Sequence, residues 1–137
     1  MMRRNVSNYS PEYSSAALAD SPSLGNLREL ELGNNGLRPE GLAALCGAGW
    51  LDSLVTLSLS RNALGDEGVR ELLGRLHSGT LARLNLGQAN LGPAGGKALL
   101  DWPGLAEVVD LSLDGNSFGK DLADQLKRIV RGTSRSR

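Results

Sequence analysis

The sequence has very few of the side chains that usually perform catalysis or hold metal ions. Among 137 residues it has one cysteine, Cys46, and one histidine, His77. A single cysteine excludes an internal disulfide bond and any zinc site built from several cysteines. A Cys–His catalytic pair needs both side chains within hydrogen-bond reach, and these two fall in different parts of the chain's pattern. We therefore expect no catalytic residue, no metal site and no cofactor.

Long apolar runs and an excess of one charge are also missing. No stretch approaches the roughly 20 apolar residues of a transmembrane helix, and none follows Arg3 and Arg4 as it would in a signal peptide. Fifteen basic residues balance fifteen acidic ones, so no overall field attracts nucleic acid or a membrane surface. Aromatic residues make up 4% of the chain. These absences favour a cytoplasmic chain without a nucleic-acid, membrane or small-molecule partner.

What the sequence has instead is a set of columns that repeat every 27 residues. The columns are Leu27, Leu54, Leu81 and Val108; Leu30, Leu57, Leu84 and Leu111; Leu32, Leu59, Leu86 and Leu113; Asn35, Asn62, Ala89 and Asn116; Leu37, Leu64, Leu91 and Phe118; Gly41, Gly68, Gly95 and Leu122; and Leu45, Leu72, Leu99 and Leu126. A fixed period of this length is typical of proteins built from stacked structural repeats. Cys46 shares a further column with Leu73 and Leu100, which predicts a core residue.

Each unit changes its periodicity half-way. Residues 29–33 alternate between apolar side chains and polar or small ones, a period of two that predicts a short strand. The apolar residues of 69–76 are spaced as one face of a helix. Pro39 and Pro93 stand where such a helix would begin, a position at which proline's missing N–H is not needed. The sequence therefore predicts an α/β solenoid of about four repeats, with a curved parallel sheet inside and helices outside.

The pattern LxxLxLxxNxLxxxGxxxL resembles the leucine-rich repeats of ribonuclease inhibitors, nucleotide-binding innate-immune receptors and Ran GTPase-activating proteins. The resemblance covers about Leu24 to Val130 and implies a member of the ribonuclease-inhibitor-like subfamily. It implies a concave sheet face that binds other proteins, and it says little about activity because such repeats serve many unrelated partners. Extracellular members of the family usually carry cysteine-stapled caps. A chain with one cysteine cannot build such a cap, so the resemblance also implies a cytoplasmic protein.

Three segments are expected along the chain. Residues 1–23 form an N-terminal segment in which Pro11 predicts the start of a capping helix. Residues 24–131 form the repeat domain, and 132–137 form a basic polar tail that we expect to be disordered. In the last predicted helix Lys127 replaces the apolar residue of the earlier units. This replacement predicts a face turned toward water at the end of the solenoid.

The third unit departs from the pattern, because Ala89 occupies the column that elsewhere holds asparagine. In the family that the repeats resemble, this asparagine bonds backbone groups of the turn. Alanine is therefore expected to cost about 1–3 kcal/mol unless a neighbour fills the gap. Asn90 is a candidate replacement if the turn is shifted by one residue. The segment is thus either a local weak point or a functional distortion.

Three further patterns match known sites only in part. Residues 110–116 with Asp121 have the acidic spacing of a calcium-binding loop, but their leucines belong to the buried columns. Residues 92–96 are glycine-rich like a phosphate loop and lack the Lys-Ser or Lys-Thr pair that follows one. Trp50 and Trp102 are frequent interface anchors by residue type. Both stand near predicted helix ends, where we expect them to cover the loops that return to the next strand.

The inner face of the predicted sheet is the candidate binding surface, because alternation leaves polar side chains there. The candidate partner-binding residues are Glu29, Glu31, Thr56, Ser58, Arg61, Arg83, Asn85, Asp110, Ser112 and Asp114. A further row holds Gly33, Ser60 and Gly87 beside Asp114, flanked by turn residues that include Gln88. Arg61 and Arg83 are best placed to pair with acidic groups, since arginine is enriched at interfaces. The alternative is that these are solvated strand residues, because the face has no aromatic anchor.

The sequence therefore predicts a non-enzymatic protein–protein interaction module that binds a partner through this face. Two alternatives stay open: a regulator of another enzyme, like the GTPase activators that the repeats resemble, and a structural or self-associating fragment of a larger repeat array. Binding of nucleic acid by the basic tail is disfavoured, because the tail has few charges and no aromatic side chain for stacking. The identity of the protein partner and the oligomeric state do not follow from the sequence.

Overall fold

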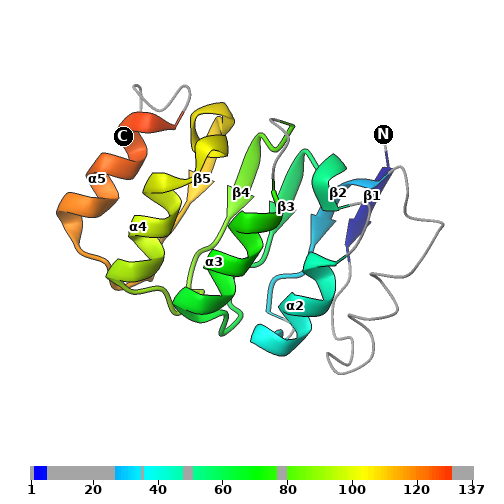
Figure 1. Cartoon of the computed structure of the whole chain (residues 1–137). Helices are drawn as coiled ribbons and strands as arrows, with labels where there is room; N and C mark the ends of the chain where they lie inside the picture. Colours follow the sequence, from blue (N-terminus) through cyan, green and yellow to red (C-terminus); the bar gives the residue numbers. More distant parts are fainter. Residues whose placement is uncertain (1, 6–26, 35, 48–50, 77–79, 131–137) are drawn as a thin grey trace.

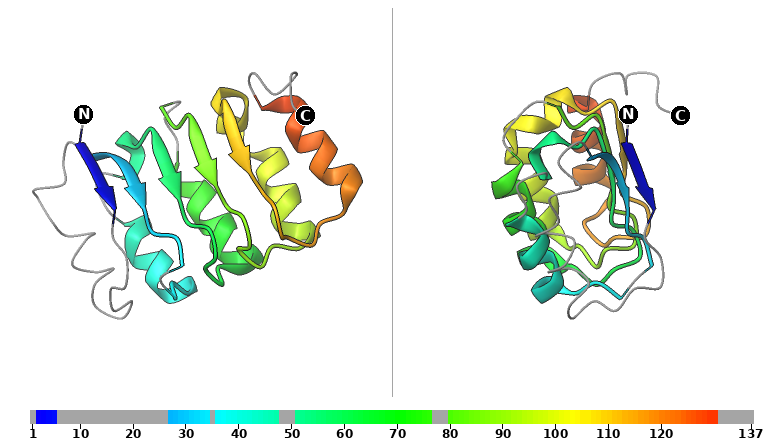
Figure 2. Two further views of the ribbon diagram at one scale, coloured as in Figure 1. Left: turned by 180° about the vertical axis from the view of Figure 1, so that it is seen from behind. Right: turned by 90° about the vertical axis from the view of Figure 1, so that its right-hand side faces the viewer.

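The computed structural model describes residues 2–5, 27–34, 36–47, 51–76 and 80–130, which form a layer of strands covered by a layer of helices (Figure 1). The parallel five-stranded sheet follows chain order: β1 (Met2–Asn5), β2 (Leu27–Glu31), β3 (Thr56–Ser58), β4 (Arg83–Asn85) and β5 (Asp110–Ser112). The helices are α2 (Pro39–Cys46), α3 (Gly65–Arg75), α4 (Pro93–Asp101) and α5 (Lys120–Ile129), with short 3-10 helices at Leu51–Ser53 and Pro103–Glu107. Helices α2 to α5 lie on the same side of the sheet (Figure 2). The predicted α/β repeat solenoid is confirmed.

The strands pair in the register that the 27-residue spacing predicts. Glu29 lies opposite Thr56, Thr56 opposite Arg83, and Arg83 opposite Asp110. Because the other paired rows keep the same register, each strand column of the sequence becomes a row of neighbouring residues across the sheet. Residues of one row are about 4.8 Å apart on adjacent strands.

Strand β1 is a fifth strand that the repeat pattern does not predict. It pairs in parallel with β2, with Arg3 opposite Glu29. Residues 2–5 lack the leucines of the pattern and join the sheet along an edge of β2 whose backbone groups would otherwise have no strand partner. The capping helix expected to begin at Pro11 lies outside the described residues.

The leucine columns fill the space between the sheet and the helices. The buried leucines include Leu30, Leu57 and Leu84 in one row, Leu32, Leu59 and Leu86 in the next, Leu37, Leu64 and Leu91 after the turns, and Leu45, Leu72 and Leu99 on the helices. Each such side chain stabilises the fold by roughly 1.5–3 kcal/mol relative to an exposed one. Cys46 is buried among them, as its column predicts. On α5, Leu126 is buried and Lys127 is exposed, which confirms the predicted water-facing side of the last helix.

Asn62 connects two consecutive turns of the solenoid. Its side chain is 3% exposed, and its Oδ1 accepts a hydrogen bond from the Leu37 N–H at 2.8 Å. Its Nδ2 donates to the carbonyls of Leu32 and Leu59 at 2.9 and 3.0 Å. Asn116 makes the corresponding bonds between the third and fourth repeats. These amides pair buried backbone groups that the turns leave without a backbone partner.

The asparagine side chains that bond one repeat to the next form a ladder along the solenoid, and Ala89 interrupts this ladder between the second and third repeats. Backbone hydrogen bonds replace part of the missing side-chain bonding. The Leu64 N–H, which an asparagine at position 89 would reach, donates instead to the Asn62 carbonyl at 3.0 Å. The Gly65 N–H donates to the Ala89 carbonyl at 3.1 Å. Asn90 does not take over the role, because its side chain is exposed and its φ is 62°. The shifted-turn hypothesis is therefore wrong, and backbone bonds of the same two repeats supply the replacement.

Asp66 makes a second contact between these two repeats by capping helix α4. Its Oδ1 accepts hydrogen bonds from the N–H groups of Gly92 and Gly95 at 2.8 and 2.9 Å. A carboxylate on α3 thus satisfies N-terminal donors of the next helix, which that helix cannot pair internally. A Cβ at position 95 would lie 2.5 Å from this oxygen, so the contact requires glycine there.

Replacing Asp66 with alanine is expected to lower the free energy of unfolding by about 1–2 kcal/mol. The substitution removes an N-terminal cap and a negative charge at the positive end of a helix. Urea denaturation followed by circular dichroism measures the change. Glu67→Ala is the control, because that side chain lies one residue later and is 84% exposed, and it should cost less than about 0.5 kcal/mol. Equal losses in the two variants would contradict the capping role.

Candidate functional site

The side of the sheet away from the helices is here named the open face, and it corresponds to the inner face expected from the sequence (Figure 2). Along each strand the leucines point toward the helices and the alternate residues point to the open face. The candidate residues of the paired rows are Glu29, Thr56, Arg83 and Asp110, then Glu31, Ser58, Asn85 and Ser112. The structure therefore brings these eight predicted residues together on adjacent strands β2 to β5.

Two shallow hollows mark the open face. The first, named the strand hollow, has a volume of about 200 Å³ and is lined by Glu31, Thr56, Leu57, Ser58, Arg83, Leu84, Asn85, Asp110 and Ser112. The second, named the turn hollow, has a volume of about 280 Å³ and is lined by Ser60, Arg61, Asn85, Gly87, Gln88, Ser112 and Asp114. Because Asn85 and Ser112 line both, the hollows are neighbours. Of the predicted binding residues, Glu29 is the one that lines neither hollow.

The turn hollow depends on glycine at position 87. The Gly87 N–H donates to the Asn85 Oδ1 at 3.0 Å, which folds that amide back along its own strand. A Cβ at Gly87 would lie 3.2 Å from the same oxygen and 3.3 Å from the Asp114 carbonyl oxygen. A larger residue would therefore crowd both neighbours. Glu31 makes the matching bond on β2, accepting from the Gly33 N–H at 3.1 Å.

The turns that border this hollow hold non-glycine residues in a left-handed conformation. Arg61 has a φ of 58° and Gln88 a φ of 49°, whereas the fourth repeat has Gly115 at the same position with a φ of 81°. Left-handed backbone costs non-glycine residues roughly 1–2 kcal/mol. The second and third repeats therefore place long polar side chains at a position that glycine would occupy without strain.

Four charged side chains on the open face have no partner within the part of the chain that the structure describes. Arg61, Arg83, Asp110 and Asp114 are exposed, and none of them makes an ion pair or side-chain hydrogen bond among the described residues. The two arginines belong to the second and third repeats and both aspartates to the fourth, so the sign changes once across the sheet, between β4 and β5. The face can therefore present both charges to a partner.

Buried polar atoms lie at the floor of the strand hollow. Ser58 is 6% exposed although it stands on the open face, because longer side chains flank it in its row. Among the described residues the hydroxyl oxygen of Thr56 is buried and has no hydrogen-bond partner. Leu57 and Leu84 line the same hollow, so it presents polar and apolar groups together.

The comparisons with known proteins agree with this architecture. The family model described as "Leucine Rich repeat" matches residues 26–46, 52–73 and 77–100. The chain is a leucine-rich-repeat protein. No curated protein sequence matches it.

Two solved structures have a similar leucine-rich-repeat fold. The "Leiomodin-1 Actin-Binding Site 2 (ABS2)" structure has a TM-score of 0.70 at 17% identity, and the match covers 97% of this chain and 80% of that one. The tropomodulin C-terminal domain of Caenorhabditis elegans also has a TM-score of 0.70, at 15% identity, over 98% of this chain and 85% of that one. Identities this low establish a shared fold and carry no residue-level function.

The structure places the other sequence candidates of this leucine-rich-repeat protein in structural roles. Residues 110–112 are strand β5, as the repeat register requires. Trp102 is 6% exposed and donates its indole N–H to the Leu76 carbonyl at 3.1 Å, so it is a core residue rather than a surface anchor. His77 and Trp50 lie outside the described residues. The described part of the chain holds no cluster of three or more His, Cys, Asp or Glu suited to a metal ion, and none of its helices is long and apolar enough to cross a bilayer.

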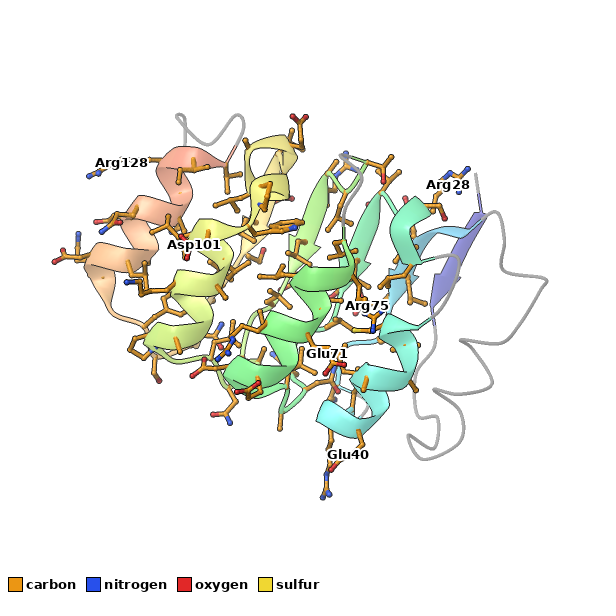
Figure 3. The ribbon with its side chains drawn as sticks, in the orientation of Figure 1. Arg28, Glu40, Glu71, Arg75, Asp101 and Arg128 are labelled. Atoms are coloured by element: carbon orange, nitrogen blue, oxygen red, sulfur yellow. The ribbon has the colours of Figure 1, made fainter. Side chains whose placement is uncertain are left out.

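Cys46 is a buried thiol held in its neutral form. Burial raises the pKa of Cys46 from 9.0 to about 11; the Glu71 carboxylate adds to the rise and the Arg75 guanidinium opposes it. Figure 3 shows both charged residues on α3. A catalytic cysteine needs a lowered pKa and access to substrate, and Cys46 has neither.

Raising the pH from 9 to 11 is expected to weaken the fold through Cys46. The unfolded thiol ionises near pH 9.0 and the folded one near 11, so the stabilisation is complete below 9 and is lost as the pH rises toward 11. In the folded chain below pH 9, iodoacetamide should label Cys46 far more slowly than it labels the urea-unfolded chain. Equal labelling rates would contradict the burial. Cys46→Val should reduce the loss of stability between pH 9 and 11.

Three residues that line the turn hollow were absent from the predicted site, namely Ser60, Gly87 and Gln88, and the strand hollow adds the buried-row residues Leu57 and Leu84. Ser60 and Gly87 lie in the row of Asp114, and Gln88 follows it. The same 27-residue register that predicts the strand rows therefore contains the signal for them. That these residues surround a hollow follows only from the conformation of the turns.

Proposed function

We propose that this leucine-rich-repeat chain is a non-enzymatic protein–protein interaction module that binds its partner through the open face. The observation that carries the proposal is the set of four exposed charges around two hollows on the side of the sheet away from the helices, none of them paired among the described residues. Solenoids commonly bind partners on the sheet side because it offers an extended, rigid surface. The buried, neutral Cys46 supports a function without catalysis.

The structural neighbours supply a first partner to test. The leiomodin-1 domain is named as an actin-binding site, and a shared fold makes actin a reasonable first protein to test here. Co-sedimentation with filamentous actin and titration of monomeric actin test both assembly states. The proposal for the open face concerns the surface and does not require actin.

The single cysteine and the 27-residue repeat also support membership of the ribonuclease-inhibitor-like subfamily, a cytoplasmic location and a repeat domain spanning 24–131. Domain boundaries are tested by limited proteolysis, which should leave a resistant fragment close to these limits. Location is tested by fractionating the cells that produce the protein. Proteolytic cleavage at a site within residues 24–131 would contradict these domain boundaries.

The interaction proposal is tested by affinity capture from an extract of the producing cells, read by mass spectrometry. The test variant is Arg61→Glu with Arg83→Glu, which reverses the positive charges that line the two hollows. The matched control is Arg70→Glu with Arg75→Glu, which makes the same charge change on α3 on the helical side, where Figure 3 labels Arg75. Circular dichroism must show that both variants are folded.

A partner recovered by the parent and the control, and lost by the open-face variant, is the expected result. Partners retained equally by all three proteins would contradict the open face as the binding surface. A mass that rises with protein concentration would favour the self-associating alternative. A recovered enzyme whose rate changes on addition of the chain would favour the enzyme-regulator alternative.

A further inference from the structure

The unpaired charges of the open face are distributed evenly between the two hollows. Arg83 and Asp110 line the strand hollow, and Arg61 and Asp114 line the turn hollow. Each hollow therefore has one arginine and one aspartate in its wall, and the strand hollow also has the Glu31 carboxylate, which accepts a hydrogen bond from the Gly33 N–H. The two pairs lie toward opposite ends of the strands, because Asp110 and Asp114 are four residues apart, or about 13 Å in an extended chain.

The opposite charges within each hollow do not neutralise one another. Arg83 lies directly opposite Asp110 in the strand register, yet the two side chains form no ion pair and both are exposed. On the surface of the free protein this arrangement is stable, because water solvates each charge and an exposed ion pair gains little. Both charges of each pair remain available to a partner.

A partner that covers a hollow removes water from both charges at once. A buried charge without an opposite charge or hydrogen bonds is strongly unfavourable. A purely acidic partner would pair with the arginines and leave Asp110 and Asp114 buried and unpaired, and a purely basic partner would do the reverse. A partner with both signs gives every unpaired charge in the walls an opposite charge when the hollow is covered.

The strand hollow also has uncharged groups in its lining. Among the described residues the Thr56 hydroxyl is buried without a hydrogen-bond partner, and Ser58 is also polar. Leu57 and Leu84 line the same hollow. The uncharged lining is therefore both polar and apolar, and the charges of the walls carry the inference about the partner.

We propose that the open face recognises a mixed-charge protein segment, which presents an acidic side chain to the arginine and a basic side chain to the aspartate of a hollow. This inference rests on the proposed function, since it assumes that the open face is the binding surface. It adds the chemistry of the partner: both signs of charge in one short segment. Such complementarity sets specificity and binding rate.

The probe is a phage-displayed library of random twelve-residue peptides, selected on the full chain at low salt. The blocked control is Ser112→Trp, because Ser112 lines both hollows and an indole there obstructs the region they share without changing charge. Ser60→Trp replaces it if circular dichroism shows Ser112→Trp to be unfolded. Peptides that bind the parent and not the blocked control are synthesised, and their dissociation constants are measured.

The expected peptides carry at least one acidic and one basic residue. Asp114→Lys should weaken their binding at least tenfold, and replacing the peptide's basic residue with glutamate should restore binding to that variant. Arg61→Glu should act in the same way on the peptide's acidic residue. Peptides with one sign of charge or none, still excluded by Ser112→Trp, would overturn the mixed-charge inference alone.

One further outcome overturns the proposed function as well. Peptides that bind Ser112→Trp as tightly as the parent would show that the binding surface lies elsewhere. A selection that enriches no sequence over the blocked control would overturn the mixed-charge segment alone, because the affinity capture tests folded partners separately. The readouts therefore distinguish failure of the open face as the binding surface from failure of the mixed-charge segment as its partner.

Discussion

Replacing Asn62 with alanine is expected to lower the free energy of unfolding by about 3 kcal/mol or more. The amide is buried, accepts from the Leu37 N–H and donates to the carbonyls of Leu32 and Leu59. Alanine cannot make these bonds, and each buried backbone group left without a partner costs about 1–3 kcal/mol before relaxation. The structure already shows how far relaxation can go, because at Ala89 neighbouring backbone groups replace part of the lost bonding.

Urea denaturation of the purified chain measures this loss. Gln125→Ala is the matched control, because it removes an amide of the same chemistry from an exposed position on α5, and it should change the free energy by less than about 0.5 kcal/mol. A loss below about 1 kcal/mol for Asn62→Ala would mean that the turn can rearrange as it does around Ala89. The role of the ladder as a main connection between the first two repeats would then be wrong.

Replacing Trp102 with alanine is expected to lower the free energy of unfolding by about 3–5 kcal/mol, the usual range for a large aromatic residue removed from a core. The indole is 6% exposed, and its N–H donates to the carbonyl of Leu76 at the end of α3. It also packs on the return loop, because a Cβ at Gly104 would lie 2.6 Å from the ring. The alanine variant therefore leaves a cavity and an unpaired carbonyl together.

Trp102→Phe separates the two contributions. Phenylalanine keeps most of the apolar volume and loses the N–H, so it should cost less than the alanine variant while retaining a hydrogen-bond loss of about 1 kcal/mol. Both variants should bind the partner once folded, because Trp102 does not line either hollow. Loss of partner binding in folded Trp102→Phe with unchanged stability would show that Trp102 is an interface residue after all.

The leucine columns show why so much of the fold could be predicted. A strand alternates every two residues and a helix every 3.6, so Leu30 and Leu32 predict a strand while Val69, Leu72 and Leu73 predict a helix. Since 27 residues separate equivalent positions without an insertion, stacking the units places Thr56 beside Arg83 before any coordinates are known. The rows of the open face follow from this arithmetic.

The structural features that the repeat pattern did not predict depend on contacts between neighbouring strands and repeats. Nothing in residues 2–5 marks a strand, and β1 exists because β2 has an edge that accepts backbone hydrogen bonds. In the sequence, Asp66 looks like any acidic residue in the first turn of a helix. Its cap on α4 becomes visible only when Gly92 and Gly95 of the following repeat lie against it.

The sequence by itself determined the repeat, the strand register, the leucine core and which residues share the open face, because all of these depend on periodicity along the chain. The tertiary structure alone decided that Arg61 and Gln88 adopt left-handed turns, that Gly87 leaves a hollow between them and Asp114, and that the four charges of the face stay unpaired. Those properties depend on side-chain directions and on distances between repeats. A pattern of residue types does not contain these distances.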